Sequence, residues 1–97
     1  MRIAIDTCVG KQGRRLLERA GHKIVVEARS GEMDRLWFQR ALASGVELVI
    51  SADMDLEIHC YDHEVPFFRA RQRHSGLVTA ERVLRRYPGA VERKEDR

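Results

Sequence analysis

The chain has 97 residues, 43% of them hydrophobic and 34% charged, a balance that excludes an intrinsically disordered protein and predicts a single globular domain over residues 1–97. No apolar run approaches the roughly 20 residues of a membrane-spanning helix, and no secretory signal is recognisable, so we expect a cytoplasmic protein with no membrane partner. The net charge of +3 is unevenly divided, because residues 1–68 hold 9 Lys and Arg against 11 Asp and Glu, whereas residues 69–97 hold 9 against 4. The basic end favours a polyanionic partner, although a solvated surface explains it as simply.

Short apolar runs alternate with amphipathic segments over the first half of the chain. We predict strands over residues 2–6, 22–28 and 46–50, because each contains contiguous apolar residues. One helix ending at Gly21 and a second over residues 33–44 connect these strands, each with apolar residues on one face and a glycine at its end. Strands joined by single helices run parallel, so this half of the chain predicts a doubly wound α/β fold.

The second half of the chain has a weaker pattern. Residues 57–64 are compatible with a short helix or an irregular loop, and residues 65–70 with a fourth strand. Thr79 is a suitable N-cap for a last helix over residues 80–86, and we expect the charged residues 91–97 to fray. The complete pattern predicts an α/β protein whose mainly parallel central sheet has four or five strands.

Acidic side chains follow two of the predicted strands. Asp6 ends the first strand, and Asp53 and Asp55 come directly after the third. Asp34 stands in the first turn of the helix that leads into the third strand. Because ligands bind beyond the carboxyl ends of parallel strands, we expect these acids to gather at one edge of the sheet. Carboxylates held together repel one another unless a cation joins them, and Mg²⁺ or Mn²⁺ bound there would promote phosphodiester hydrolysis.

Each of these acids also has a purely structural explanation. Asp6 would cap the following helix, and Asp34 would interact favourably with a helix dipole. Asp53 and Asp55 would act as turn formers. For any single residue the structural explanation is the simpler one, but the joint placement of all four acids at strand ends favours a binding site.

From residue 1 to about residue 56 the chain resembles the short bacterial PIN-like proteins, which are relatives of the PIN-domain toxin ribonucleases. The matching segments are Ile5-Asp6, the sequence LLERAGH over residues 16–22, Asp34 with Trp37 and Ala41, and the sequence LVISADMDL over residues 48–56. The apolar strand followed by Asp-x-Asp is the most specific of these segments. Two positions depart from the family pattern, since Cys8 and Gly10 stand where an Asn and a Pro are common.

The resemblance implies a PIN-like three-layer α/β/α sandwich and a Mg²⁺- or Mn²⁺-dependent nuclease. Such an enzyme would hydrolyse phosphodiesters, most often in RNA, as the toxin of a toxin-antitoxin pair with an antitoxin protein as its partner. Carried onto this sequence, the resemblance implies that Asp6, Asp34 and Asp53 are catalytic metal ligands and that Asp55 is a fourth catalytic acid. The alternative is a non-catalytic PIN-like module that binds protein or nucleic acid.

Three arginines, Arg69, Arg71 and Arg73, alternate along the edge of the predicted fourth strand and the loop after it, and His74 follows them as a further candidate contact to a phosphate backbone. Arginines in this arrangement would bind the phosphate backbone of a nucleic acid, and we predict them as the nucleic-acid-binding residues. Charged residues that protect an edge strand from pairing with another chain would have the same pattern.

Trp37 and Phe38 are neighbours in the second predicted helix. Adjacent helical positions point in different directions, so we expect one ring to be buried and the other to be exposed. An exposed aromatic ring would suit a homodimer or another partner surface.

Cys8, His59, Cys60 and His63 are the side chains from which a zinc site would be built. The spacing lacks the paired C-x-x-C pattern that makes such sites specific. We therefore expect two reduced thiols and a surface pair of histidines on one helical face.

Overall fold

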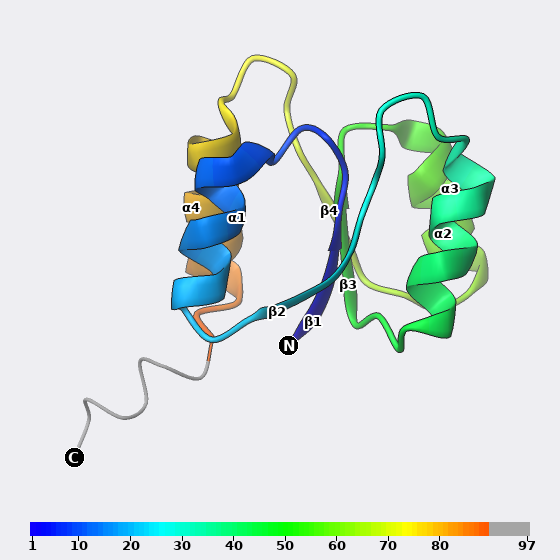
Figure 1. The fold of residues 1–97 in the computed structure, drawn as a ribbon, viewed down its shortest axis with the longest axis horizontal. Coiled ribbons are helices and arrows are strands. Elements are labelled where there is room, and N and C mark those ends of the chain that lie inside the picture. The colour runs from blue at the N-terminus through cyan, green and yellow to red at the C-terminus, as the bar shows by residue number, and fades with distance from the viewer. Residues whose placement is uncertain (90–97) are drawn as a thin grey trace.

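The computed structural model describes residues 1–89, which form one sheet between two layers of helices (Figure 1). Residues 90–97, which include the predicted charged tail, lie outside the described residues. The strands are β1 (Arg2–Ile5), β2 (Lys23–Glu27), β3 (Leu48–Ser51) and β4 (Phe67–Arg69). The helices are α1 (Gly10–Arg19), α2 (Asp34–Ala43), α3 (Met54–Asp62) and α4 (Gly76–Arg86). The predicted α/β class is confirmed, with four strands in the part of the chain that is described.

The strand order β2-β1-β3-β4 places β1 inside the sheet, and every neighbouring pair of strands is parallel. The chain therefore moves from β1 to one edge at β2, and then crosses β1 to form β3 and β4 on the other side. This reversal makes the space beyond the carboxyl ends of β1 and β3 the topological switch point. In open α/β sheets, ligands bind in the crevice at such a point.

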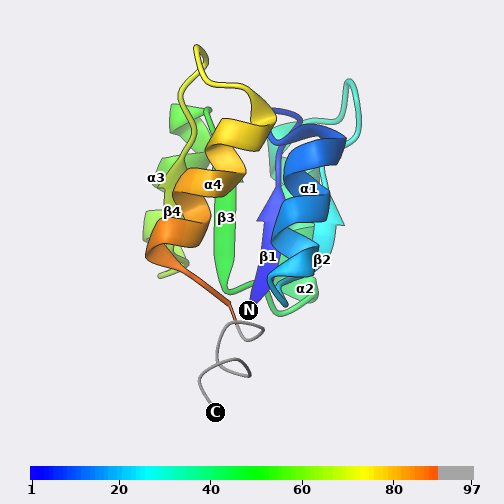
Figure 2. The ribbon, with the colours of Figure 1, turned by 90° about the vertical axis from the view of Figure 1, so that its left-hand side faces the viewer.

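The sheet is covered on both faces. Helices α1 and α4 lie side by side on one face, and α2 and α3 cover the other (Figures 1 and 2). Along β1, Ile3 and Ile5 pack toward α1 and α4, whereas Ala4 packs toward α2 and α3. Ile50 and Val49 of β3 divide between the two faces in the same way. Because both faces are buried, these strands appear in the sequence as continuous apolar runs.

Helix α3 begins earlier than the sequence pattern indicated. It starts at Met54, and Asp53 is its N-cap, with the Asp53 side chain accepting a hydrogen bond from the backbone N–H of Asp55. Residues 57–64, predicted as a short helix or an irregular loop, are therefore mostly the later part of this helix. This capping hydrogen bond fixes the orientation of the Asp53 side chain at the carboxyl edge of the sheet.

Helix α4 also begins earlier than predicted. Ser75 is its N-cap, accepting a hydrogen bond from the backbone N–H of Val78, and Thr79 is fully buried one turn into the helix. The prediction of Thr79 as the N-cap was therefore wrong. Ser75 and Thr79 are both good capping residues, and the packing of α4 against α1 selects the earlier start.

Two glycines allow α1 and α4 to meet at their N-terminal ends. A Cβ atom on Gly76 would lie 1.8 Å from the carbonyl oxygen of Val9, and one on Gly13 would lie 2.5 Å from the carbonyl oxygen of Gly76. Both positions require the absence of a side chain, because backbone atoms occupy the space. The contact fixes the loop before α4 beside the loop that follows β1.

Both aromatic residues of α2 are buried, Trp37 at 1% exposure and Phe38 at 4%, so the prediction that one would be exposed was wrong. Helix α3 is the reason, because the rings of His59 and His63 pack against Phe38, with ring centroids 5.7 and 5.3 Å away. The exposed apolar residues of this layer lie instead on the outer face of α3, at Met54, Ile58 and Tyr61.

Both cysteines are free thiols, as expected. Cys8 packs against the core beneath α1 and α4, whereas Cys60 belongs to the core beneath α2 and α3. The sheet separates them, so a zinc site containing both cysteines is not formed. None of the helices within residues 1–89 has the length and apolar character needed to cross a membrane.

Candidate functional site

A pocket of about 550 Å³ opens at the switch point of the sheet. Its residues come from the end of β1, from the end of β3 and from the loop between β4 and α4, and they are Asp6, Thr7, Cys8, Ala52, Asp53, Arg71, Gln72 and His74. Carboxylates from the strand ends and basic side chains from the β4–α4 loop therefore line the same pocket.

Asp6 is held in place by hydrogen bonds at the end of β1. Its Oδ2 accepts a hydrogen bond of 2.7 Å from the hydroxyl of Ser51, and its Oδ1 accepts one of 2.7 Å from the backbone N–H of Thr7. The same Ser51 oxygen accepts from the backbone N–H of Asp53 at 3.0 Å. Ser51 is fully buried, and it therefore joins the two predicted metal ligands through a single hydroxyl group. Sequence reasoning missed Ser51, although a polar residue ending an apolar strand is a usable signal.

Asp34 and Asp53 bring their carboxyl groups within hydrogen-bonding reach of each other. Burial, followed by the neighbouring Asp53 and the charge of Asp6, raises the pKa of Asp34 to about 6. The pKa of Asp53 is lowered by its hydrogen bond to Asp34 and by the backbone N–H groups of Asp55 and Leu56. The pair therefore shares one proton at mildly acidic pH, and Asp34 carries it, because the N-terminus of α3 stabilises the charge on Asp53.

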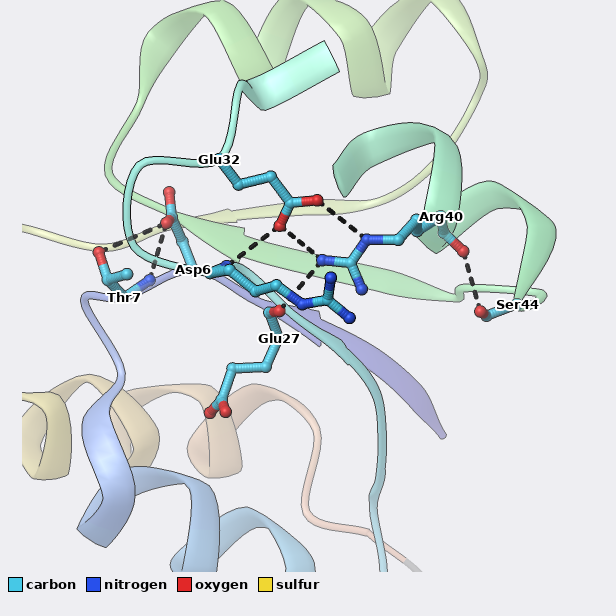
Figure 3. A network of polar contacts seen from close by, with 7 residues as sticks. Asp6, Thr7, Glu27, Glu32, Arg40 and Ser44 are labelled. Atoms are coloured by element: carbon cyan, nitrogen blue, oxygen red, sulfur yellow. Dashed lines mark hydrogen bonds and ion pairs between the residues drawn. The ribbon is translucent and has the colours of Figure 1, made fainter. Parts of the chain in front are cut away.

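The segment before Asp34 is fixed by an ion pair. The Arg40 guanidinium donates to both carboxylate oxygens of Glu32, at 3.0 and 2.6 Å, and Glu32 also accepts from the backbone N–H of Arg29 (Figure 3). The Glu32 side chain is only 12% exposed, and its hydrogen bonds to Arg40 lower its pKa. A bidentate pair of this kind orients as well as stabilises. It ties the loop after β2 to α2, at whose start Asp34 lies.

The acids fit a hard divalent cation with some of its water retained. Within residues 1–89, no three His, Cys, Asp or Glu side chains converge closely enough to hold a metal ion by themselves. Asp34 and Asp53 provide two adjacent carboxylates, with Asp6 at longer range. Mg²⁺ commonly takes one or two protein carboxylates and keeps several waters. An oxygen-only donor set therefore suits Mg²⁺ or Mn²⁺ better than zinc.

Asp55, predicted as a fourth catalytic acid, does not line the pocket. It is an exposed residue in the first turn of α3, and its backbone N–H, rather than its carboxylate, contacts Asp53. The structure therefore places Asp6 and Asp53 in the pocket lining and Asp34 next to Asp53 but outside the lining, and it leaves the Asp55 side chain apart from all three.

The three predicted arginines have different positions. Arg71 lines the pocket, Arg69 forms an ion pair with Glu57 of α3 at 2.5 Å, and Arg73 is an exposed residue outside the pocket lining. Gln72 and His74 also line the pocket; sequence reasoning grouped His74 with the arginines and missed Gln72. The available signal for Gln72 was its position after the fourth parallel strand, since that end of the strand lies at the same edge of the sheet.

Cys8 lines the pocket as an uncharged thiol. Burial, followed by the negative charge of Asp6, raises the pKa of Cys8 to about 11. A thiol of that pKa is not a nucleophile at neutral pH, since the thiolate is the reactive form. The chemistry of the pocket therefore belongs to the carboxylates and to the basic loop.

His59 lies on α3, and His63, four residues later, is the C-cap of that helix. Both pack against Phe38, and with Arg35, Gln39 and Leu42 they line a pocket of about 290 Å³ between α2 and α3. This pocket is separate from the one at the switch point.

Comparison with known proteins gives no relative for this chain: no family profile, no curated protein and no solved structure matches it significantly.

Proposed function

We propose that this protein is a Mg²⁺- or Mn²⁺-dependent nuclease that hydrolyses phosphodiester bonds in RNA. The observation that carries the proposal is the adjacent carboxyl pair of Asp34 and Asp53, of which Asp53 lines the same pocket as Asp6 and Arg71. A metal ion needs concentrated negative charge, and a phosphodiester needs positive charge near it. Asp6 and Asp53 supply the negative charge and Arg71 supplies the positive charge, and all three line the same pocket of about 550 Å³.

Each residue has a defined task in this proposal. Asp34 and Asp53 bind the cation, and at neutral pH both are available as carboxylates. Asp6, oriented by Ser51, adds negative charge to the same edge. Arg71, which lines the same pocket, contacts the phosphate. The bound ion would supply a water of lowered pKa and neutralise charge on the reacting phosphate.

A calorimetric Mn²⁺ titration tests the acidic site without knowledge of the substrate. We expect wild-type protein to bind Mn²⁺ and Asp53→Asn to lose that binding while keeping its fold, since asparagine is also a good N-cap. Asp62→Asn is the matched control, because Asp62 is an exposed acid at the other end of α3. Absence of Mn²⁺ binding in the wild type, or equal binding in Asp53→Asn, would contradict the proposed metal site.

Cleavage of RNA tests the reaction itself. We expect Mn²⁺-dependent cleavage by the wild type and by Asp62→Asn, and none by Asp6→Asn or Asp53→Asn, with cooperative melting curves that show all four proteins to be folded. A substrate panel that includes DNA identifies the nucleic acid. Full activity in both site variants would exclude the proposed chemistry.

A role as the toxin of a toxin-antitoxin pair is part of the proposal and follows only from the resemblance of the first 56 residues. Such a nuclease stops growth when it is expressed without its antitoxin. We therefore expect induced wild-type protein to arrest bacterial growth and Asp53→Asn, produced at the same level, to leave growth unaffected. Arrest by both proteins would mean that any toxicity does not come from the acidic site.

A second candidate function, a non-catalytic binding module, is favoured by the outer face of α3. Met54, Ile58 and Tyr61 are spaced along one side of this helix and are 62%, 59% and 84% exposed. Apolar side chains gathered on an exposed face are typical of contact with another protein. A melting curve that Mn²⁺ leaves unchanged, together with no cleavage of any nucleic acid, would favour this function.

A further inference from the structure

The loop between β4 and α4 contributes three side chains to the pocket that the carboxylates also line. Arg71, Gln72 and His74, called here the basic wall, line the switch-point pocket together with Asp6 and Asp53. A negatively charged group entering the pocket would be repelled by the acids and attracted by this wall. The wall is therefore the part of the pocket that selects for an anion.

Arg82 fixes the orientation of His74 from outside the pocket. Its Nη1 lies 3.5 Å from Nδ1 of His74, and its guanidinium group lies 5.5 Å from the ring centroid of Phe68. A guanidinium group can only donate hydrogen bonds, so Nδ1 of His74 is the acceptor and its proton is carried on Nε2. With Nδ1 occupied by Arg82, the neutral His74 ring can donate a hydrogen bond from Nε2–H. Burial, and then the positive charges of Arg82, Arg73 and Arg71, hold the pKa of His74 below its ordinary value.

We propose that Arg71 and neutral His74 bind a phosphate group of the substrate, with Arg82 as the positioning residue that sets the tautomer of His74. The identity of the phosphate as part of RNA rests on the proposed function, whereas phosphate binding at this wall requires no metal. Gln72 provides an amide beside the same group.

Metal binding by the acids and phosphate binding by the basic wall are coupled electrostatically. A divalent cation at Asp34 and Asp53 removes the repulsion that these acids, with Asp6, exert on a phosphate. By linkage, a cation that strengthens phosphate binding is itself bound more tightly when phosphate is present. Binding of a metal ion by Asp34 and Asp53 and binding of a phosphate by the basic wall therefore strengthen each other.

The test is an NMR titration of the histidine ring signals with inorganic phosphate in metal-free buffer. The chain has four histidines, and His74→Gln identifies the signal of His74. We expect phosphate to shift this signal and to raise the pKa of His74, because the anion offsets the charges of Arg71, Arg73 and Arg82 and adds to those of Asp6 and Asp53. Arg71→Gln should weaken phosphate binding about tenfold, which is the effect of losing one charge-assisted hydrogen bond.

Two variants separate positioning from general electrostatics. Arg82→Gln should raise the pKa of His74 in the phosphate-free protein and weaken the response to phosphate. Arg85→Gln, an exposed position on the same helix, should change neither. Repeating the titration with a short oligoribonucleotide tests whether the phosphate of RNA binds as the free ion does.

The outcomes of these experiments distinguish failure of the phosphate-binding proposal from failure of the nuclease proposal. No response of His74 to phosphate, or an equal response in wild type and Arg71→Gln, would overturn the assignment of the wall. Phosphate binding without Mn²⁺ binding would leave the wall in place and contradict the nuclease. Mn²⁺ binding and cleavage with an unresponsive His74 would contradict the wall alone.

Discussion

The carboxyl groups of Asp34 and Asp53 lie together although each belongs to the start of a different helix, α2 and α3 respectively. Two helices that cover the same face of the sheet begin at its carboxyl edge, and each contributes one acid there. In the absence of a cation, burial and then the neighbouring Asp53 and the charge of Asp6 raise the pKa of Asp34. Carboxyl groups held this close destabilise the folded protein when no ion is bound, and a bound cation would offset that destabilisation.

The first prediction is that Asp34→Asn stabilises the metal-free protein at neutral pH. Folding raises the pKa of Asp34 from 3.8 to about 6, so the folded state holds this proton more tightly than the unfolded state. Stability supplied by the protonated form is complete below pH 3.8 and is lost as the pH rises through about 6. Asparagine carries no charge at any pH, so the Asp34→Asn variant does not lose this stability as the pH rises.

For each kcal/mol of repulsion relieved, the melting temperature should rise by about 4–8 °C. Melting curves measured in chelator from pH 4 to pH 8 check this, with Asp62→Asn as the control. The advantage of Asp34→Asn should grow between pH 4 and pH 6 and then become constant. A variant that melts below the wild type at pH 8 would show that the pair is not repulsive.

The second prediction concerns Ser51, whose hydroxyl joins Asp6 to the backbone of Asp53. Ser51→Ala leaves a part-buried carboxylate oxygen and a backbone N–H without this partner, so we expect a loss of about 1–3 kcal/mol in the free energy of unfolding. Because both acids lose their orientation, Mn²⁺ affinity should fall as well.

Urea unfolding and Mn²⁺ calorimetry measure these two effects. Ser44→Ala is the control, since Ser44 lies at the end of α2 and its hydroxyl donates to the carbonyl of Arg40 in the same helix. The control should keep wild-type Mn²⁺ affinity. Undiminished Mn²⁺ affinity in Ser51→Ala would mean that the hydroxyl does not organise the site.

Topology alone places Asp6 and Asp53 at the site, whereas it does not say which basic residues of the later segment reach the site, and the reason is the range of the contacts involved. Asp6 and Asp53 follow buried parallel strands, so topology alone places them at one edge. Arg71 and His74 reach that edge because α4 packs closely against α1 at Gly76 and Gly13, a contact between distant segments that local patterns do not encode.

Two other differences have local causes. The start of α3 is ambiguous in the sequence because Asp53 suits a turn, although Asp53 followed by acids at Asp55 and Glu57 is also the signature of a helix N-terminus. The burial of both Trp37 and Phe38 depends on α3 covering α2, so it could not be predicted while α3 itself was unassigned.

The third prediction is that Gly76→Ala destabilises the protein although alanine favours helices. The backbone φ of Gly76 is not positive, so in an open helix alanine would be better by about 1 kcal/mol. Here the new Cβ would lie 1.8 Å from the carbonyl oxygen of Val9, and α4 must move away from α1. The net cost should be about 1–3 kcal/mol, which is typical of overpacking.

Gly31→Ala is the comparison for that experiment, because Gly31 has a positive φ of 78° but no atom within 4 Å of the place that a Cβ would take. Its cost comes from backbone strain alone, about 1 kcal/mol. Thermal unfolding compares the two variants, and the phosphate response of His74 should be weakened only in Gly76→Ala. Equal stability of Gly76→Ala and the wild type would mean that the contact between the helix ends is loose.

The fourth prediction is a loss of stability at acidic pH that depends on His22. This ring is 5% exposed and lies between the backbone nitrogen of Met1, 3.0 Å from Nδ1, and the carbonyl oxygen of Tyr87, 2.7 Å from Nε2. Nε2–H donates to Tyr87 and Nδ1 accepts, so the neutral ring fits and a second proton does not. Burial is the main cause of a lowered pKa for His22 in the folded protein.

The folded state therefore binds the His22 proton less tightly than the unfolded state, and stability is complete above pH 6.5 and is lost as the pH falls toward the lower folded value. Glutamine at this position keeps a donor for Tyr87 and has no such titration. Urea unfolding of wild type and His22→Gln between pH 5 and pH 8 measures the difference, which also cancels the opposite contribution of Asp34. The stability advantage of the wild type should shrink below pH 6.5, and an advantage that stays constant down to pH 5 would show that protonation of His22 does not oppose folding.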